Sequence, residues 1–146
     1  MIVIIGQVTL PGRSGNDWSG ASVMVEESGQ SAVTGSNGNF TLNNVSIDNG
    51  LSLKADAPGY LPARCTLPSV SQPQVELAST ALLSGDVNDD AQVDITDAVA
   101  IGLDFGATGP DLLTDINRTG NVDIFDVILL GINFGRGTQT WDCMAK

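Results

Sequence analysis

Oxygen-bearing side chains recur in the second half of the chain at a spacing that suits metal binding. The twelve residues 86–97 are repeated at 115–126, an offset of 29 residues, and 9 of the 21 positions aligned over 86–106 and 115–135 are identical. Oxygen-bearing residues occupy positions 1, 3, 5, 9 and 12 of both copies. Calcium takes six to eight oxygen ligands, and a twelve-residue loop supplies them at these positions. The repeat therefore predicts two Ca²⁺ ions.

Each loop has its own expected ligand set, in which position 7 acts through its backbone carbonyl and position 9 through water. The first set is Asp86, Asn88, Asp90, Gln92, Asp94 and Asp97, and the second is Asp115, Asn117, Thr119, Asn121, Asp123 and Asp126. Ala91 stands at position 6, where a positive φ is needed, at a cost of about 1 kcal/mol relative to glycine. Thr119 removes one negative charge from the second loop, so we expect weaker calcium binding there, although Gly120 eases its turn.

A short helix is expected after each loop, because apolar residues follow at i, i+3, i+4, i+7 and i+8. The two stripes are Ile95, Ala98, Val99, Gly102 and Leu103, and Ile124, Val127, Ile128, Gly131 and Ile132. We expect these stripes to fill a core and each helix to end near Phe105-Gly106 or Phe134-Gly135. Phe125, Leu129 and Leu130 lie off the stripe, which makes them candidates for contact with a partner.

The elements that must carry these loops begin with a β-rich first half. Gly, Ser, Asn and Pro occur every eight to twelve residues between short β-branched runs, which is typical of an all-β sandwich. The expected strands are Ile2–Thr9, Ala21–Glu26, Ser31–Thr34, Asn39–Asn44, Leu51–Ala55, Ala63–Leu67 and Gln74–Ala78. The first strand is apolar on consecutive positions, which fits either an ordinary core strand or a strand inserted into a neighbouring subunit. The connector 79–84 is so short that the two halves should pack together.

Composition argues against several classes of function. The net charge is −11, and eleven of the seventeen acidic residues lie in residues 85–146, which disfavours nucleic acid and anionic membranes as partners. There is no histidine, no glycine-rich phosphate loop and no apolar run of transmembrane length. Most paired acids are accounted for by the calcium spacing. We therefore expect a protein that is not an enzyme and has no membrane span.

The two cysteines, Cys65 and Cys143, allow one disulfide between the first half and the C-terminal tail, or else two separate buried thiols. Weak calcium sites suit an extracellular or cell-surface setting, which favours the disulfide. Asn39-Phe40-Thr41 and Asn44-Val45-Ser46 are glycosylation sequons, so Asn39 and Asn44 are possible glycosylation sites.

Two family resemblances follow from these motifs. The duplicated motif, with Gly85-Asp86-Val87-Asn88 and Asp115-Ile116-Asn117 opening its copies, resembles the dockerin family over residues 84–137. The run Thr34–Leu42 with Ala57-Pro58-Gly59-Tyr60 resembles the carboxypeptidase-regulatory-like family and collagen-adhesin B-type repeats over residues 2–80. These resemblances imply two small domains, a seven-stranded prealbumin-like sandwich at 1–80 and an α-helical dockerin-like pair of calcium loop-helix units at 81–146. Dockerins bind cohesins, which are β-sandwich domains, and the family's contact positions add Thr96 to the partner-binding candidates.

Three functional hypotheses remain open. The first is a non-catalytic extracellular assembly protein whose calcium module docks on a β-sandwich, cohesin-like partner. The second is a self-assembling homopolymer, a fibre or surface-layer subunit, in which the sandwich of one copy is the partner of the next. The third is a carbohydrate-binding module in which Trp18 and Tyr60 stack on a sugar.

Overall fold

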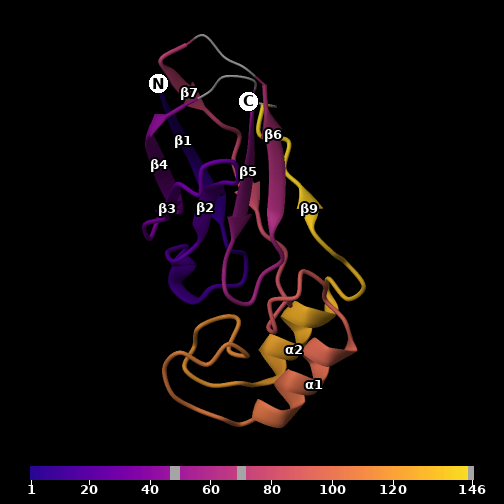
Figure 1. Cartoon of the computed structure of the whole chain (residues 1–146). Coiled ribbons are helices and arrows are strands. Elements are labelled where there is room, and N and C mark those ends of the chain that lie inside the picture. The colour runs from indigo at the N-terminus through magenta and orange to yellow at the C-terminus, as the bar shows by residue number, and fades with distance from the viewer. Residues whose placement is uncertain (47–49, 69–71, 145–146) are drawn as a thin grey trace.

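Two β-sheets face each other in the N-terminal part of the chain (Figure 1). In the computed structural model, which describes residues 1–46, 50–68 and 72–144, one sheet has the order β4-β1-β7 with β8 also paired to β1, and the other has the order β3-β2-β5-β6-β9. The strands are β1 (Ile2–Thr9), β2 (Ser22–Val25), β3 (Ser31–Val33), β4 (Asn39–Val45), β5 (Leu51–Asp56), β6 (Ala63–Leu67), β7 (Gln74–Glu76), β8 (Thr80–Ala81) and β9 (Gln139–Thr140). All seven strands expected from the sequence are present, and a β-sandwich is confirmed, although β8 and β9 are strands beyond the seven predicted.

Alternating side chains build the core between the two sheets. In β5 and β6 every second residue is buried and its neighbour points outward, as period-2 patterning requires. β1 is a central strand, since it pairs with β4 on one side and with β7 and β8 on the other. Its apolar run therefore serves the protein's own core, and the alternative of a strand inserted into a neighbouring subunit is not needed.

The C-terminal tail returns to the sandwich. β9 pairs in parallel with β6, and Cys143 forms a disulfide with Cys65 of β6. The indole of Trp141 packs edge-on against Phe40 at 6.3 Å between ring centroids and donates a hydrogen bond to the Ala78 carbonyl. The disulfide expected from the sequence is confirmed, and the last residues of the predicted second domain belong structurally to the sheet of the first.

Two short helices pack against each other at one end of the sandwich, far from both termini (Figure 1). They are α1 (Ile95–Asp104) and α2 (Ile124–Gly131), and a single 3₁₀ turn, η1 (Ser14–Asn16), lies at the same end of the sheets. Both helices follow their loops as predicted. α1 ends beside Phe105, whereas α2 ends at Gly131, before the predicted Phe134-Gly135. No helix among the described residues has the length and apolarity needed to cross a membrane.

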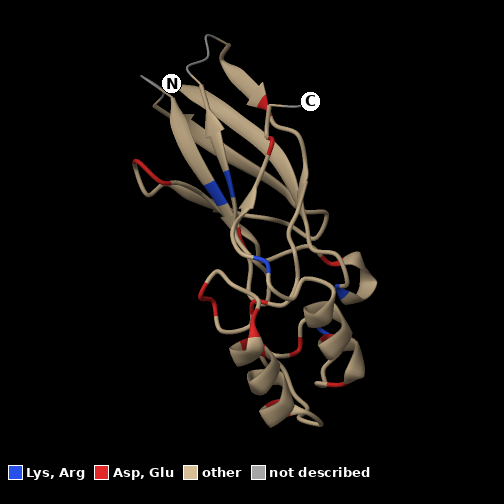
Figure 2. Ribbon diagram, turned by 90° about the vertical axis from the view of Figure 1, so that its right-hand side faces the viewer, with Lys and Arg blue, Asp and Glu red and all other residues tan. Residues whose placement is uncertain are grey.

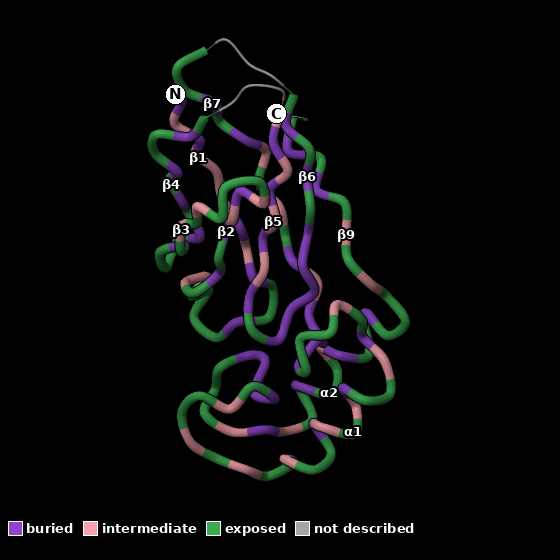
Figure 3. Tube along the Cα trace, in the orientation of Figure 1, coloured by how far each residue is buried: buried purple, intermediate pink, exposed green. Residues whose placement is uncertain are grey.

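The helices are rotated relative to the sequence prediction (Figure 3). The buried residues of α1 are Asp97 and Ile101, and those of α2 are Asp126 and Leu130. Most of the predicted stripe faces solvent, with Ile95 64% and Leu103 81% exposed. The prediction that this stripe fills a core is wrong, because the carboxylate at loop position 12 must point into the loop. At about 100° per residue, that orientation turns positions two before and two after it outward.

Hydrogen bonds join the helical end to the sandwich. The Asn133 side chain donates to the carbonyl of Ser84 at 2.9 Å, and the Ser84 hydroxyl donates to the carbonyl of Leu129 at 2.8 Å. The backbone N–H of Gly85 donates to the carbonyl of Gly59 at 2.8 Å. These buried contacts hold the loops and helices directly against the sheets, as the short connector predicted.

Candidate metal-binding loops

The first loop is closed around the carboxylate of Asp86. Its two oxygens accept the backbone N–H groups of Asp90 at 3.2 Å and Ala91 at 3.0 Å, so the chain wraps back on its first ligand. Asp86 is almost completely buried, and burial raises its pKa to about 6. Ala91 has φ 66°, as position 6 requires, so the predicted left-handed conformation is confirmed.

The second anchor of this loop is Asp97, the position-12 residue. One carboxylate oxygen accepts the N–H groups of Val87 at 3.0 Å and Asn88 at 3.2 Å, and the other accepts the N–H of Asp94 at 2.9 Å. This residue is fully buried on the inner face of α1. A helix residue thereby fixes both the beginning and the end of the loop.

Three carboxylates of the first loop converge. One oxygen each from Asp86, Asp90 and Asp97 lies within 4.8 Å of the other two, and two of these residues are buried. Like charges at such spacing repel strongly where water is excluded, unless a cation is bound. The Asn88 amide nitrogen donates to the Thr96 hydroxyl at 2.9 Å, and its Oδ1 accepts the N–H of Asp90 at 3.3 Å. The chemistry of the donor set, all oxygen and mostly anionic, fits a hard divalent cation such as Ca²⁺.

The second loop repeats the same backbone pattern. Asp115 accepts the N–H groups of Thr119 at 3.3 Å and Gly120 at 2.9 Å, and Asp126 accepts the N–H of Asp123 at 2.9 Å. Burial raises the pKa of Asp126 above its usual range. Both loops thus place their first and last carboxylates identically with respect to the backbone.

Fewer charges meet in the second loop. The Thr119 hydroxyl lies 3.1 Å from the side-chain oxygen of Asn117 and 3.2 Å from that of Asn121, where the first loop has a carboxylate at position 5. Gly120 carries φ 95° at position 6, a conformation that glycine adopts without a steric penalty. The second loop is therefore less strained and less acidic than the first.

The position-9 aspartates have a role that the ligand spacing did not indicate. Asp94 and Asp123 are the N-caps of α1 and α2, and each forms a reciprocal capping box with the aspartate at position 12. Their side chains accept the N–H groups of Thr96 and Phe125 at 3.1 Å. The sequence carried the signal, since a helix-capping Asp three residues before an acid is a start motif. Gln92 and Asn121 form isolated bridges to Gly137 and Thr108.

The expected partner-binding residues divide into three groups. Thr96 and Phe125 are exposed, and Leu129 is half-buried with its side chain against Gly12. Leu130 is only 4% exposed and packs in the core, so it does not belong to an accessible surface. The reason is the helix rotation described above, which places Leu130 four residues after Asp126 on the inner face.

Large apolar residues are exposed on both helices and at their ends. We refer to this set as the helical apolar face, and its members are Ile95, Val99, Leu103, Phe105, Ile124, Phe125, Val127, Ile128, Ile132 and Phe134. Acidic residues gather around the loops at the same end of the molecule (Figure 2). The sequence identified most of these apolar residues but assigned them to the core.

Two further predicted sites can be located. Asn39 and Asn44 are exposed on β4, and glycosylation there stays a prediction. Tyr60 is fully buried, and its hydroxyl donates to the Pro11 carbonyl at 2.7 Å, so it cannot stack on a sugar. The prediction that Tyr60 joins Trp18 in a carbohydrate site is wrong, because Tyr60 closes the end of the core.

The fold and the two loops define a β-sandwich protein that carries a short helical, calcium-loop-like segment at one end. Two solved structures share this fold, an N-terminal and a C-terminal interface mutant of a type II Cohesin-X-Dockerin complex from Acetivibrio cellulolyticus. Their TM-scores are 0.80 and 0.79, each at 22% identity, covering 94% of this chain and 97% of the other. No family model matches the chain, and no curated protein matches it. The likeness at this identity establishes the fold.

The family assignments made from the sequence have to be corrected. The similar structures come from type II cohesin complexes, and the described part of this chain is mostly β with only two short helices, so no dockerin module is evident at residues 84–137. The carboxypeptidase-regulatory-like assignment of residues 2–80 likewise has no matching family model. A twelve-residue loop motif specifies local loop chemistry and the first turn of a helix, and it does not specify the domain that carries them.

Proposed function

We propose that this protein is a non-catalytic interaction module of an extracellular assembly, and that two Ca²⁺ ions bound in its loops hold its interaction surface in place. The observation that carries the proposal is the coupling of each loop to a helix. Asp97 and Asp126 are at once the closing residues of the loops and the inward-facing anchors of α1 and α2. A cation at either loop therefore bears directly on the orientation of a helix.

Calcium at the first loop is supported by the three converging carboxylates. Without a cation, ionised Asp86, Asp90 and Asp97 would repel one another within 4.8 Å, and the raised pKa of Asp86 reflects that burial opposes its charge. Oxygen donors at this spacing suit calcium better than zinc, which takes nitrogen and sulfur ligands. Asn88, Asp94 and the Gln92 carbonyl complete the proposed first set.

Calcium at the second loop is supported by the repeated backbone pattern. Asp115 and Asp126 occupy the same loop positions as Asp86 and Asp97. Asn117, Thr119, Asn121 and Asp123 complete the proposed second set. The lower charge favours weaker binding than at the first loop. Because calcium binds the folded form, occupancy of both loops should stabilise the protein by mass action.

The helical apolar face supports a protein partner. Ten large apolar side chains, most of them more than half exposed, lie on two adjacent helices and their ends. Exposed apolar surface of this kind marks interaction sites in soluble proteins. The structurally similar proteins occur in a complex between two protein chains, which also supports a protein partner. The disulfide fits an oxidising, extracellular setting.

Calorimetry and circular dichroism test the calcium proposal. We expect calcium titration to reveal two sites of unequal affinity, and excess chelator to reduce the helical circular dichroism signal. The purified cohesin and X-dockerin chains of the similar complexes are the first probes for a partner. A chain that binds no calcium, or whose helical signal is unchanged in chelator, would refute the calcium proposal.

Self-assembly is the second candidate, because one chain holds both a sandwich and a helical apolar face. Calcium-dependent oligomers of the isolated protein, measured by light scattering, would favour it, and a monomer would favour a separate partner. Val99→Asp places a charge within the helical apolar face and should abolish either association. Val33→Asp is the matched control for binding to a separate partner, since Val33 is 66% exposed on β3, in the sandwich. Equal loss in both variants would contradict the proposed surface.

A further inference from the structure

A cavity of about 310 Å³ lies between the sandwich and the second loop. Its lining residues are Arg13, Asp17, Ser19, Gly20, Pro58 and Arg118. The backbone N–H of Ser14 donates to the Asn117 carbonyl at 2.8 Å, which draws η1 and the second loop together and brings the two arginines to the same cavity. The chain has six basic and seventeen acidic residues, so two arginines at one cavity are unusual in this protein.

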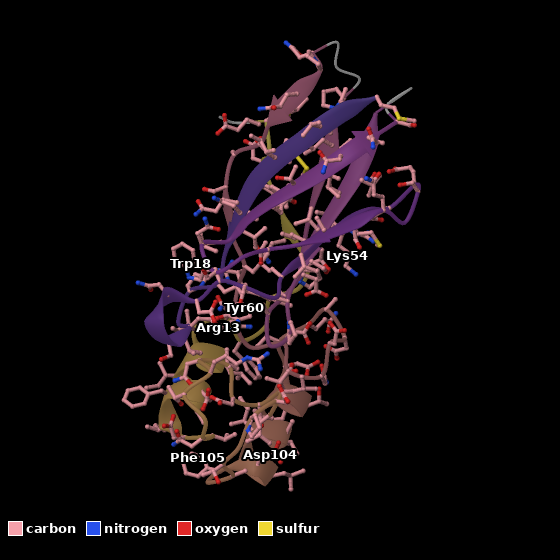
Figure 4. All side chains as sticks on the ribbon, turned by 90° about the vertical axis from the view of Figure 1, so that its left-hand side faces the viewer. Arg13, Trp18, Lys54, Tyr60, Asp104 and Phe105 are labelled. Atoms are coloured by element: carbon pink, nitrogen blue, oxygen red, sulfur yellow. A yellow bond between two sulfur atoms is a disulfide. The ribbon has the colours of Figure 1, made fainter. Side chains whose placement is uncertain are left out.

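Arg13 is the central group of this cavity. Only 8% of the surface of Arg13 is exposed. Its Nη1 donates a hydrogen bond to the Ser19 carbonyl at 3.3 Å. Its Nε is buried and has no hydrogen-bond partner among the described residues. The guanidinium carbon of Arg13 lies 5.5 Å from the ring centroid of Tyr60. Figure 4 labels the two residues side by side. A buried guanidinium has five donors to satisfy, and leaving one unpaired is costly. The cation–π contact offsets only part of that cost.

The charge of the cavity is also uncompensated. Burial lowers the pKa of Arg13 and the nearby positive charge of Arg118 lowers it further, while Tyr60 and Asp17 act in the opposite direction. Neither arginine has a carboxylate within ion-pair distance, since the pair found among the described residues is Arg64 with Glu26. Asp17 is exposed, and its carboxylate accepts the N–H of Ser19 at 3.2 Å. Two cations and one displaced acid leave a net positive cavity in an acidic protein.

We propose that this cavity binds a small oxyanion, a carboxylate or a sulfate, between the guanidinium groups of Arg13 and Arg118. Guanidinium groups recognise carboxylate and sulfate-like oxygens through paired, charge-assisted hydrogen bonds. A bound oxyanion would accept charge-assisted hydrogen bonds from the two guanidinium groups and separate the two like charges. It would also bridge η1 to the second loop, which are joined here by the single backbone hydrogen bond from Ser14.

Nuclear magnetic resonance titration of the intact chain tests this site. Sodium sulfate and sodium glucuronate are added separately at constant ionic strength, with calcium present so that the loops are in one state. We expect saturable shifts of the Arg13 Nε–H and of the Ser19 amide with at least one of the two anions. The preferred anion then distinguishes an inorganic oxyanion from a carboxylate ligand.

Two variants should change the anion affinity in opposite directions, and a third is the control. Arg118→Gln should weaken binding by roughly tenfold, the loss of one charge-assisted contact. Asp17→Asn should tighten it by roughly two- to fivefold, because an exposed like charge is removed. Arg136→Gln is the control, since Arg136 is exposed and does not line this cavity.

Two outcomes would overturn the proposal. Shifts that rise linearly without saturation for both anions would mean that no site exists. Saturable binding that is unchanged in Arg118→Gln and in Asp17→Asn would place the anion elsewhere. Calcium titration of Arg118→Gln checks that its second loop is intact, so a failure of this site is distinguishable from a failure of calcium binding.

Discussion

Removal of the Cys65–Cys143 disulfide should cost this protein a large part of its stability. The two cysteines are separated by 78 residues, and the enclosed segment contains both candidate calcium loops and both helices. In the chain-entropy description, closing a loop of that length lowers the entropy of the unfolded chain enough to stabilise the fold by about 4.5 kcal/mol. A domain of this size has a free energy of unfolding of only about 5 to 15 kcal/mol. The crosslink therefore carries roughly a third or more of the total.

Urea denaturation of the oxidised and reduced protein measures this contribution. We expect the transition midpoint to fall sharply on reduction, and the m-value to rise because the uncrosslinked chain unfolds to a more expanded state. The double variant Cys65→Ala, Cys143→Ala controls for the reductant, since the sequence has no other cysteine. A loss below about 1 kcal/mol on reduction would refute the reasoning. It would mean that the crosslink restricts the unfolded chain far less than the chain-entropy description requires.

Three further predictions concern the loops and the junction. Ala91→Gly should stabilise the first loop by about 0.5 to 1 kcal/mol, because relief of the left-handed strain at this residue exceeds the added conformational entropy of the unfolded chain. Gly120→Ala should destabilise the second loop by about 1 to 2 kcal/mol. Both changes are measured by urea denaturation in calcium. Without calcium, stability should rise as pH falls from 7 towards 5, because burial raises the pKa values of Asp86 and Asp56 to about 6, above the unfolded value near 3.9, and the folded form takes up protons first. With calcium the sign reverses, because protons compete for Asp86, and denaturation at pH 5, 6 and 7 with and without chelator distinguishes the two cases. Gly12→Ala should loosen the junction, since an added Cβ would lie 2.7 Å from the Leu129 side chain at a φ of +95°, and a melting temperature unchanged from wild type would contradict this.

Much of the fold could be predicted from the sequence because its signals are local. Period-2 alternation placed all seven expected strands within a few residues of their observed ends, and β1 and β6 match residue for residue. The loop spacing likewise brought Asp86, Asp90 and Asp97 together, since twelve residues with a tight turn at Ala91 can close on themselves without help from the rest of the chain.

The tertiary structure alone decided which face of each helix is inside. The apolar stripe beginning at Ile95 looked like a core face, but Asp97 must reach the loop, and Ile101 follows it inward one turn later. The loop repeat also could not predict the protein family, because a short motif determines local chemistry only. Long-range placement came last. The return of the tail to β6 and the approach of Arg118 to Arg13 depend on contacts between residues distant in sequence, which no local pattern specifies.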